Sequence, residues 1–426
     1  MTRRFTRRQA LLAAGSATLA LGARATAEEM RLRMFWWGGK DRADRTYKVN
    51  ELYSAKHAGV TISGETLGWG DYWPRMATQA AGHNIPDVIQ MDYRYIYEYA
   101  RRGALLPLDK FMPDPLGIRD FGTDALASGR VDGKLYGVPI GLNSMAMIYS
   151  KTAYEKAGLP PPTHETTWAQ YADLSAELTK AVGKAGYWGS ADAGGAEWAL
   201  EVWVRQRGKS LYGPEDRLGF DADDISDWFA YWDDMRKRHA CVPPEVQALD
   251  QHNIDTEMLS LGHAATAFEF SNLLVGMQAL TRDALAMTMF PQGPAGSKPG
   301  QYLKPAMLWS AYAQTKFPDE SVRVIDFCVE DADAARVLST ERGVPPSPAM
   351  RKVITPDLND LDRQSVDFIT LATPRVGPLP PPPPKGAGEN ELMLRRVNEQ
   401  VGFGRMTPSA AGKQFVTDAA ANLLRG

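Results

Sequence analysis

Leu32-Arg33-Met34-Phe35-Trp36-Trp37-Gly38-Gly39 is a short apolar run that ends in two glycines, and a helical pattern from Arg45 to His57 follows it. The same order then repeats. Val60 to Leu67 alternates apolar and polar residues like a strand, Trp73 to Ala81 has helical spacing, and Pro86 to Met91 is a third apolar run. Strands that alternate with helices predict a parallel sheet covered on both faces, which is an α/β fold.

The residues directly after each predicted strand are the first candidates for a binding site. Ligands of open α/β sheets bind in the crevice beyond the carboxyl ends of the strands. The three stretches at those ends are Trp36-Trp37-Gly38-Gly39, Gly68-Trp69-Gly70-Asp71 and Asp92-Tyr93-Arg94-Tyr95.

The N-terminus has the pattern of an export signal. The arginine pairs Arg3-Arg4 and Arg7-Arg8 precede an apolar, small-residue run from Ala10 to Gly22, and Ala25-Thr26-Ala27 follows as a cleavage site. The run is too short to span a bilayer of roughly 30 Å, so cleavage is favoured over a membrane anchor. The arginine pair followed by apolar residues is similar to a twin-arginine signal. We therefore expect residues 1–27 to be a signal peptide and the mature protein to be periplasmic.

Length and charge limit the possible functions. About 400 residues remain after cleavage, which is more than one hydrophobic core usually holds, so two lobes are expected. The formal charge is -3 and the chain has no basic tract, so nucleic acid is not an expected partner. Cys241 and Cys328 have no metal-ligand spacing, and the sequence leaves open whether they are free or bridged. No cofactor is predicted. The chain has eleven Trp and sixteen Tyr, and this aromatic content suggests that aromatic rings take part in its function.

Several short motifs, in a fixed order, resemble extracellular solute-binding protein family 1, the substrate-binding proteins of carbohydrate ABC importers. Each motif alone is weak, but their order covers most of the mature chain. They are Ile85 to Asp92, Gly103 to Asp109, Asp132 to Pro139, Ile148 to Lys151, Tyr154 to Gly158 with Pro160 to Thr163, Thr167 to Ala169, Gly262 to Ala267, Trp309 to Ala313 with Pro318 to Glu320, and Thr407 to Leu424. The opening Trp36-Trp37-Gly38-Gly39 with Gly68-Trp69 also resembles the branch of the family that binds oligogalacturonides.

The resemblance implies a two-lobed periplasmic binding protein of type II, like the maltose-binding protein, with the ligand cleft between the lobes and a hinge of several segments. The chain would cross between lobes near Pro139 to Ser144, Pro305 to Ser310 and Gly343 to Ser347. The N-terminal lobe would then contain residues 28–139 and 309–349, and the C-terminal lobe residues 140–308 and 350–426. Two features depart from the family pattern, namely Thr266 at a usual Met position and the long proline tract Pro378 to Pro384.

A sugar site needs aromatic platforms for C–H faces and polar side chains for hydroxyl groups. The predicted platforms are Trp36, Trp37, Trp69, Tyr93, Trp188, Trp198, Phe270 and Trp309, and Trp309 in particular is expected to stack on a sugar ring. The predicted backbone and polar contacts are Gly38, Arg42, Asp71, Asp92, Asn143, Arg205, Glu269, Ser271 and Asn272. The competing explanation for any of these Trp residues is a place in the core.

Two other classes of protein remain open at this point. A secreted glycoside hydrolase would need two carboxylates flanking the scissile bond, for which Asp92 and Glu269 are available. No motif marks either residue as catalytic, so a binding protein that is not an enzyme is favoured. A binding protein that feeds a sensor would use the same lobes and cleft as a transport protein.

We expect a monomer that binds an oligosaccharide and delivers it to the permease subunits of an ABC transporter. Several stacking surfaces suit an oligosaccharide better than a single sugar. Arg42, Arg94 and Arg205 raise the alternative of a uronic-acid unit, because a guanidinium group matches a carboxylate. The same arginines could instead form ion pairs within the protein.

Overall fold

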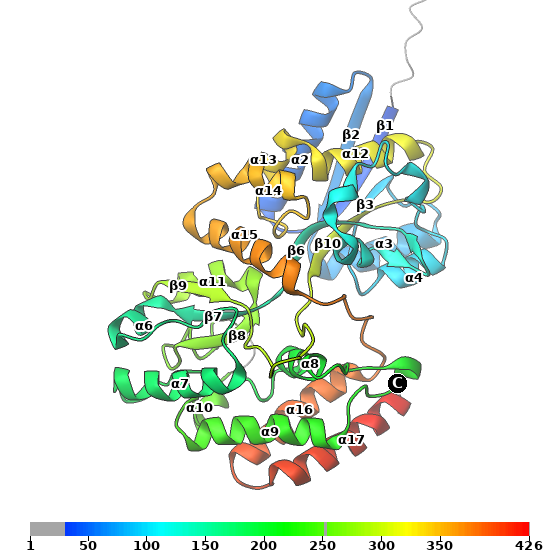
Figure 1. The fold of residues 1–426 in the computed structure, drawn as a ribbon. Helices are drawn as coiled ribbons and strands as arrows, with labels where there is room; N and C mark the ends of the chain where they lie inside the picture. The colour runs from blue at the N-terminus through cyan, green and yellow to red at the C-terminus, as the bar shows by residue number, and fades with distance from the viewer. Residues whose placement is uncertain (1–29, 251–253, 426) are drawn as a thin grey trace, which may run out of the picture.

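The computed structural model describes residues 30–250 and 254–425. The predicted signal peptide, residues 1–27, lies outside the described residues. Two lobes follow one above the other and are joined through β6, β7 and β10 (Figure 1). No helix in the described part of the chain combines the length and apolar character needed to cross a bilayer.

The first lobe is built on a five-stranded sheet with the order β2-β1-β3-β10-β6. β1 pairs in parallel with β2 and with β3, and β10 pairs antiparallel with β3 and β6. The strands are β1 (Met30–Trp37), β2 (Val60–Leu67), β3 (Val88–Met91), β6 (Val138–Asn143) and β10 (Lys304–Ala311), with a small hairpin of β4 (Arg130–Val131) and β5 (Lys134–Leu135). The predicted α/β fold with parallel strands is confirmed.

The strand order explains why both faces of this sheet are covered. The chain moves from β1 to β2 in one direction and from β2 to β3 in the other, and right-handed crossovers then place α2 and α3 on opposite faces. The helices of this lobe are α2 (Lys40–Lys56), α3 (Trp69–Ala81), α4 (Ile96–Arg101), α5 (Thr123–Ala127), α12 (Pro318–Glu330), α13 (Ala332–Leu338) and α14 (Pro348–Ile354). The reversal at β1 creates the crevice at its carboxyl end.

The second lobe has a three-stranded antiparallel sheet in the order β8-β7-β9, and helices surround it. Its strands are β7 (Met145–Ser150), β8 (Thr266–Phe270) and β9 (Leu285–Thr288). Its helices are α6 (Lys151–Ala157), α7 (Trp168–Val182), α8 (Glu197–Gln206), α9 (Ala222–Lys237), α10 (Pro244–Gln247), α11 (Leu274–Leu280), α15 (Asp360–Ala372), α16 (Ala387–Gly402) and α17 (Pro408–Arg425). Trp168, Trp228 and Trp232 are buried in its core.

Three segments of the chain pass between the two sheets and touch one another. β6 of the first sheet is followed almost directly by β7 of the second, and the chain returns from β9 to β10. In the third segment, Val344 pairs with Leu142 of β6 through two backbone hydrogen bonds of 2.8 and 3.2 Å. Both β6 and β10 extend past the predicted lobe boundaries, to Asn143 and from Lys304, so the lobe boundaries themselves stay a prediction.

Gly141 makes this contact possible, because the third segment lies where its side chain would be. A Cβ atom at Gly141 would lie 1.9 Å from the carbonyl oxygen of Arg342. Gly343, the next residue of the third segment, has a φ of +96°, which favours glycine. The three segments are therefore in direct backbone contact at the centre of the molecule.

Cys241 and Cys328 are both buried free thiols. Each packs in the interior of its lobe, Cys328 on α12 and Cys241 next to the end of α9. Burial raises the pKa of the Cys328 thiol to about 12, so it stays protonated at neutral pH.

Gly141→Ala is expected to destabilise the protein by about 1–3 kcal/mol, because the new methyl group overlaps the Arg342 carbonyl and forces the segments apart. Urea unfolding followed by tryptophan fluorescence measures the change. Gly388→Ala, in α16, is the matched control, because a Cβ atom there meets nothing within 4 Å. Equal unfolding midpoints for Gly141→Ala and the wild type would contradict the close packing of the three segments.

Candidate functional site

An aromatic cluster lies at the carboxyl ends of β1 and β2, as the sequence predicts for a sugar platform. Trp69 opens α3, and its ring contacts Trp37 edge-on at 5.1 Å and Trp73 at 5.5 Å between centroids. Trp73 in turn stacks on Tyr95 at 3.9 Å. Trp37 is only 7% exposed, whereas Trp69 is 42% exposed. The cluster therefore supports one indole, that of Trp69, which is open to solvent.

The structure corrects the prediction that Trp36 and Trp309 are sugar platforms. Trp36 is fully buried and Trp309 is 1% exposed. Trp36 packs over Gly64 and against Tyr47, and Trp309 lies in β10 opposite Gln90. Both side chains are part of the first lobe's core, so a ligand has no access to either ring in this structure.

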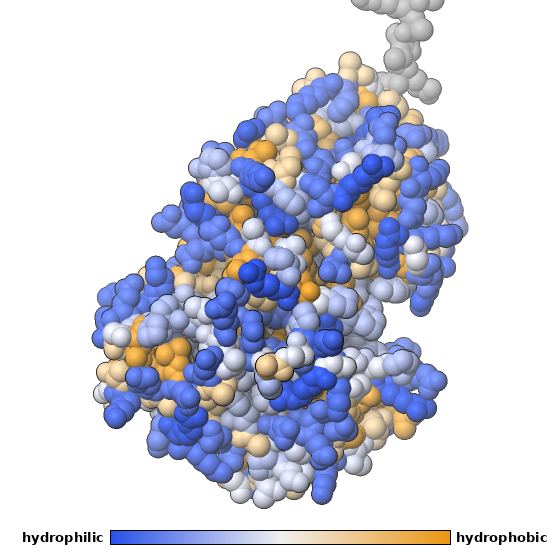
Figure 2. All heavy atoms as spheres, viewed as in Figure 1, coloured by the Kyte–Doolittle hydropathy of each residue, from blue (hydrophilic) through white to orange (hydrophobic). Residues whose placement is uncertain are grey.

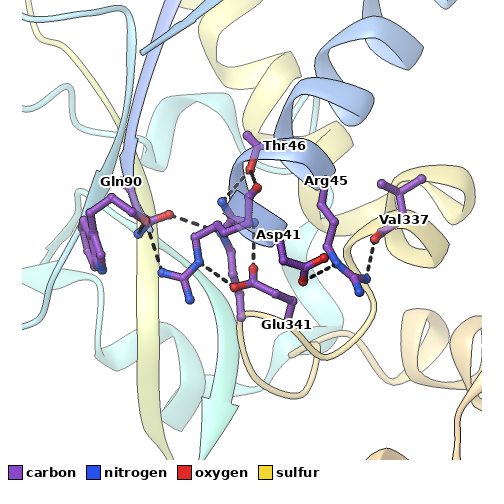
Figure 3. A network of polar contacts seen from close by, with 9 residues as sticks. Asp41, Arg45, Thr46, Gln90, Val337 and Glu341 are labelled. Carbon is purple, nitrogen blue, oxygen red and sulfur yellow. Dashed lines mark hydrogen bonds and ion pairs between the residues drawn. The ribbon is translucent and has the colours of Figure 1, made fainter. Parts of the chain in front are cut away.

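A buried polar network holds the carboxyl end of β1 and the third crossing segment together (Figure 3). Arg42 donates to Glu341 at 2.7 Å and to the Trp37 carbonyl at 3.2 Å. Arg342 donates to Thr46 at 2.7 Å and to Gln90 at 3.2 Å, and its guanidinium lies 5.5 Å from the Trp309 ring. The predicted ligand contact Arg42 is thus bonded within the protein, next to Gly38 at the end of β1.

Burial lowers the pKa of Arg342 to about 10, and the neighbouring Glu341 carboxylate opposes this shift. The side chain is 2% exposed, so its charge is kept inside the first lobe. A pKa of about 10 still leaves the Arg342 side chain protonated at neutral pH. Arg342 therefore places a positive charge between the third crossing segment and β3.

The loop after β3 brings two predicted residues to the gap between the lobes. The Asp92 carboxylate accepts a hydrogen bond from the Arg94 backbone N–H at 2.8 Å, which fixes the turn. The Tyr93 hydroxyl donates to the Pro380 carbonyl at 2.8 Å, and Pro380 lies in the segment that joins α15 to α16. Arg94 and Asp71, at the start of α3, are exposed. An indentation between the lobes is visible at the right-hand edge of Figure 2.

A cavity of about 90 Å³ in the second lobe contains two predicted residues, Trp198 and Glu269. The Trp198 indole N–H donates to the Phe268 carbonyl at 2.8 Å, which fixes the ring on the wall. The other polar residues of the lining are Asp192, Arg236, Gln247, Asp250, Glu257, Arg395, Asn398 and Glu399. Among the described residues, no group of three or more His, Cys, Asp or Glu is placed to hold a metal ion.

Some charged groups in this cavity form ion pairs, whereas single nitrogen atoms of its arginines have no partner among the described residues. Asp192 and Arg236 form an ion pair of 2.5 Å with side chains only 2% and 7% exposed. Burial raises the pKa of Glu269 to about 8, and Asp250 adds to the shift. Burial also raises the pKa of Glu257. Arg236 Nη1 and Arg395 Nε are buried without a partner in the described part of the protein. The lining therefore combines carboxyl groups with guanidinium groups.

A second hollow, of about 370 Å³, lies between the lobes beside the crossing segments. It brings together the predicted residues Asn143, Ser271 and Asn272 with Asp41 and Glu341 of the first lobe. Ser271 is buried, and its hydroxyl accepts from the Ser144 backbone N–H at 3.2 Å.

The remaining predicted residues occupy other places. Phe270 lies under the Lys304 ammonium at 5.2 Å, close to the second crossing segment. Arg205 donates to the carbonyls of Gly300 at 2.8 Å and Pro378 at 2.6 Å. Trp188 packs with a small separate cluster and lines neither hollow.

Three residues that line the cavity, Asp192, Arg236 and Arg395, were not predicted from the sequence. Asp192 lies in the small-residue stretch Ser190 to Gly195 just before α8, and this glycine-containing loop was an available signal. Arg236 and Arg395 come from the helices α9 and α16, and no local pattern marks them.

Glu269→Gln is expected to flatten the pH dependence of stability. The folded state keeps the Glu269 proton up to about pH 8, whereas an unfolded chain loses it near the ordinary value of 4.5. The contribution of Glu269 is therefore full below the unfolded pKa and is lost as the pH rises through the folded pKa. Urea midpoints measured between pH 4 and pH 9 should fall less steeply for Glu269→Gln than for the wild type. The exposed Glu177→Gln is the control, and identical slopes for all three proteins would contradict a buried proton on Glu269.

Comparison with known proteins agrees with this architecture. A solved structure of an extracellular solute-binding protein family 1 protein from Alicyclobacillus acidocaldarius has a TM-score of 0.84 and 28% identity, and covers 92% of this chain and 98% of its own. An oligogalacturonide-binding protein from Yersinia enterocolitica has a TM-score of 0.78 at 21% identity, with 93% and 99% covered. The second likeness shows the fold alone.

A putative binding protein of Brucella abortus is 29% identical over 169 residues, which is 40% of this chain and 39% of the relative's length. Residues 49–360 match the bacterial extracellular solute-binding protein family. The two-lobed periplasmic binding protein fold predicted from the sequence is therefore confirmed. The chain belongs to the bacterial extracellular solute-binding protein family.

Proposed function

We propose that this protein is the periplasmic binding component of an ABC importer for an oligosaccharide. The ligand binds between the lobes, and the closed complex delivers it to the permease subunits. The observation that carries this proposal is the solvent-exposed indole of Trp69, which contacts the Trp37, Trp73 and Tyr95 rings at the strand ends. An exposed ring supported by other rings at this position is suited to the C–H face of a sugar.

The second lobe supplies complementary chemistry. Its cavity is lined by Trp198, by the carboxyl groups of Glu257 and Glu269, and by Arg236 and Arg395. A sugar hydroxyl both donates and accepts, so it can bond to either kind of group. Platforms on one lobe and polar groups on the other support a ligand of more than one sugar unit.

The charges favour an uncharged sugar over a uronic acid. Of the three arginines that suggested a carboxylate ligand, Arg42 is paired with Glu341 and Arg205 is bonded to two backbone carbonyls, which leaves Arg94 exposed. In the cavity of the second lobe, Arg236 is likewise paired with Asp192. These pairings leave few guanidinium groups free for a carboxylate ligand.

The rival classes of function differ in what they require. A hydrolase needs a catalytic carboxylate pair, and the Asp92 carboxylate is bonded to the turn that it caps, in a family whose members are not catalytic. A sensor-coupled protein would keep the same site and differ in its membrane partner.

We also propose that the protein is exported through the twin-arginine route and acts as a monomer.

Trp69→Ala is expected to weaken saccharide binding by about 0.5–1.5 kcal/mol beyond the loss of contact area, because the stacked ring is lost. A thermal-shift screen of neutral and uronic oligosaccharides identifies the ligand, and calorimetry then gives the affinities of the wild type and the variant. Phe403→Ala is the control, because Phe403 is 44% exposed, directly follows the C-terminal end of α16 and lines neither hollow. An unchanged affinity in Trp69→Ala would show that the saccharide does not stack on Trp69. A screen that finds no saccharide ligand would refute the proposed function.

A further inference from the structure

The proline tract singled out by the sequence lies between the two lobes. We define the proline strap as residues 377–385, which join α15 to α16 without forming a helix or a strand. In Figure 1 this orange-brown segment runs through the space between the upper and the lower lobe, beside β10. Consecutive prolines have fixed φ angles and no N–H groups, so the strap is stiff and its carbonyl groups need outside donors.

The second lobe holds the first part of the strap through three contacts. The Gly377 N–H donates to the Gln301 carbonyl at 2.8 Å, and Arg205 donates to the Pro378 carbonyl at 2.6 Å. Leu379 packs against the core of the second lobe. Arg205 is itself fixed by its bond to Gly300 and by the Tyr302 ring at 5.1 Å. The strap therefore moves with the second lobe.

The first lobe contacts the strap through Tyr93. Its hydroxyl donates to the Pro380 carbonyl at 2.8 Å, between residues 287 positions apart in the sequence. The Tyr93 ring is partly buried against Tyr97 of α4, so its position is set by the first lobe. Because the two ends of this hydrogen bond belong to different lobes, any opening of the cleft at this point must break it.

We propose that Tyr93 and the proline strap form a latch between the lobes, so that Tyr93 governs ligand affinity as a positioning residue and not as a sugar contact. This inference rests on the proposed function only for its effect on affinity. The Tyr93 hydroxyl donates its one proton to the Pro380 carbonyl, so it cannot donate a hydrogen bond to a ligand in this arrangement. Arg205 has the supporting role of holding the strap in place.

The latch biases the ligand-free protein toward the closed arrangement. One hydrogen bond of ordinary strength changes the ratio of closed to open molecules about 5-fold. When a ligand binds the closed form, a smaller closed fraction lowers the apparent affinity in proportion. Loss of the latch should therefore alter the distance between the lobes before any ligand is added.

Tyr93→Phe tests the latch, because it removes the hydroxyl and keeps the ring. Spin labels on Arg102→Cys, next to α4, and Ala420→Cys, on α17, report the distance across the indentation, and both native cysteines are buried. Double electron–electron resonance of the ligand-free protein should show a shift to longer distances in Tyr93→Phe. Tyr47→Phe is the matched control, because its hydroxyl bonds to the Gly64 carbonyl within the first lobe. Its distances should equal those of the wild type.

Calorimetry with the saccharide found by the screen completes the test. Tyr93→Phe should bind it more weakly than the wild type, by at most about 5-fold. Weaker binding with an unchanged ligand-free distance distribution would make Tyr93 a direct contact and overturn the latch. Wild-type distances together with wild-type affinity would overturn it as well. A shift in distance in a protein that binds no saccharide would support the latch and refute the proposed function, so the two failures are distinguishable.

Discussion

The backbone contact between Gly141 and Arg342 is the constraint on which the arrangement of the molecule depends. A Cβ atom at position 141 would lie 1.9 Å from the Arg342 carbonyl, so the first and third crossing segments can meet only through a glycine. β10, the continuation of the second crossing, lies beside β6 in the same sheet. Three chain segments in direct contact restrict the lobes to a limited set of relative movements, as expected for a hinge.

The buried Arg342 side chain extends this constraint to the strand ends. It joins Gln90 of β3 and Thr46 of α2 to the hinge, while its neighbour Glu341 binds Arg42 and so reaches the carboxyl end of β1. A buried cation needs all of these partners, because an unpaired charge in this environment is strongly destabilising. The hinge and the platform of Trp37 and Trp69 are therefore parts of one connected structure.

The sequence predicted the architecture and part of the site, and the reasons are physical. The strand-end rule placed Trp69 correctly at the sheet edge, because parallel strands bring their carboxyl ends together. It could not distinguish Trp36 from Trp37, since neighbouring residues of a strand point to opposite faces and both faces of this sheet are covered. Trp309 was predicted to stack on a sugar for the same reason: it lies in β10 of this sheet, and the sequence does not show that its face of the sheet is covered. The cavity around Glu269 draws Arg236 and Arg395 from two distant helices, which only the packing of the second lobe brings together.

Closure of the two lobes on an oligosaccharide, about a hinge at Gly141 and Arg342, can be measured by small-angle X-ray scattering of the mature protein with and without the saccharide identified by screening. We expect a smaller radius of gyration at saturating ligand, with no change in molecular mass. A radius that stays constant at saturation would contradict closure of the lobes around the ligand.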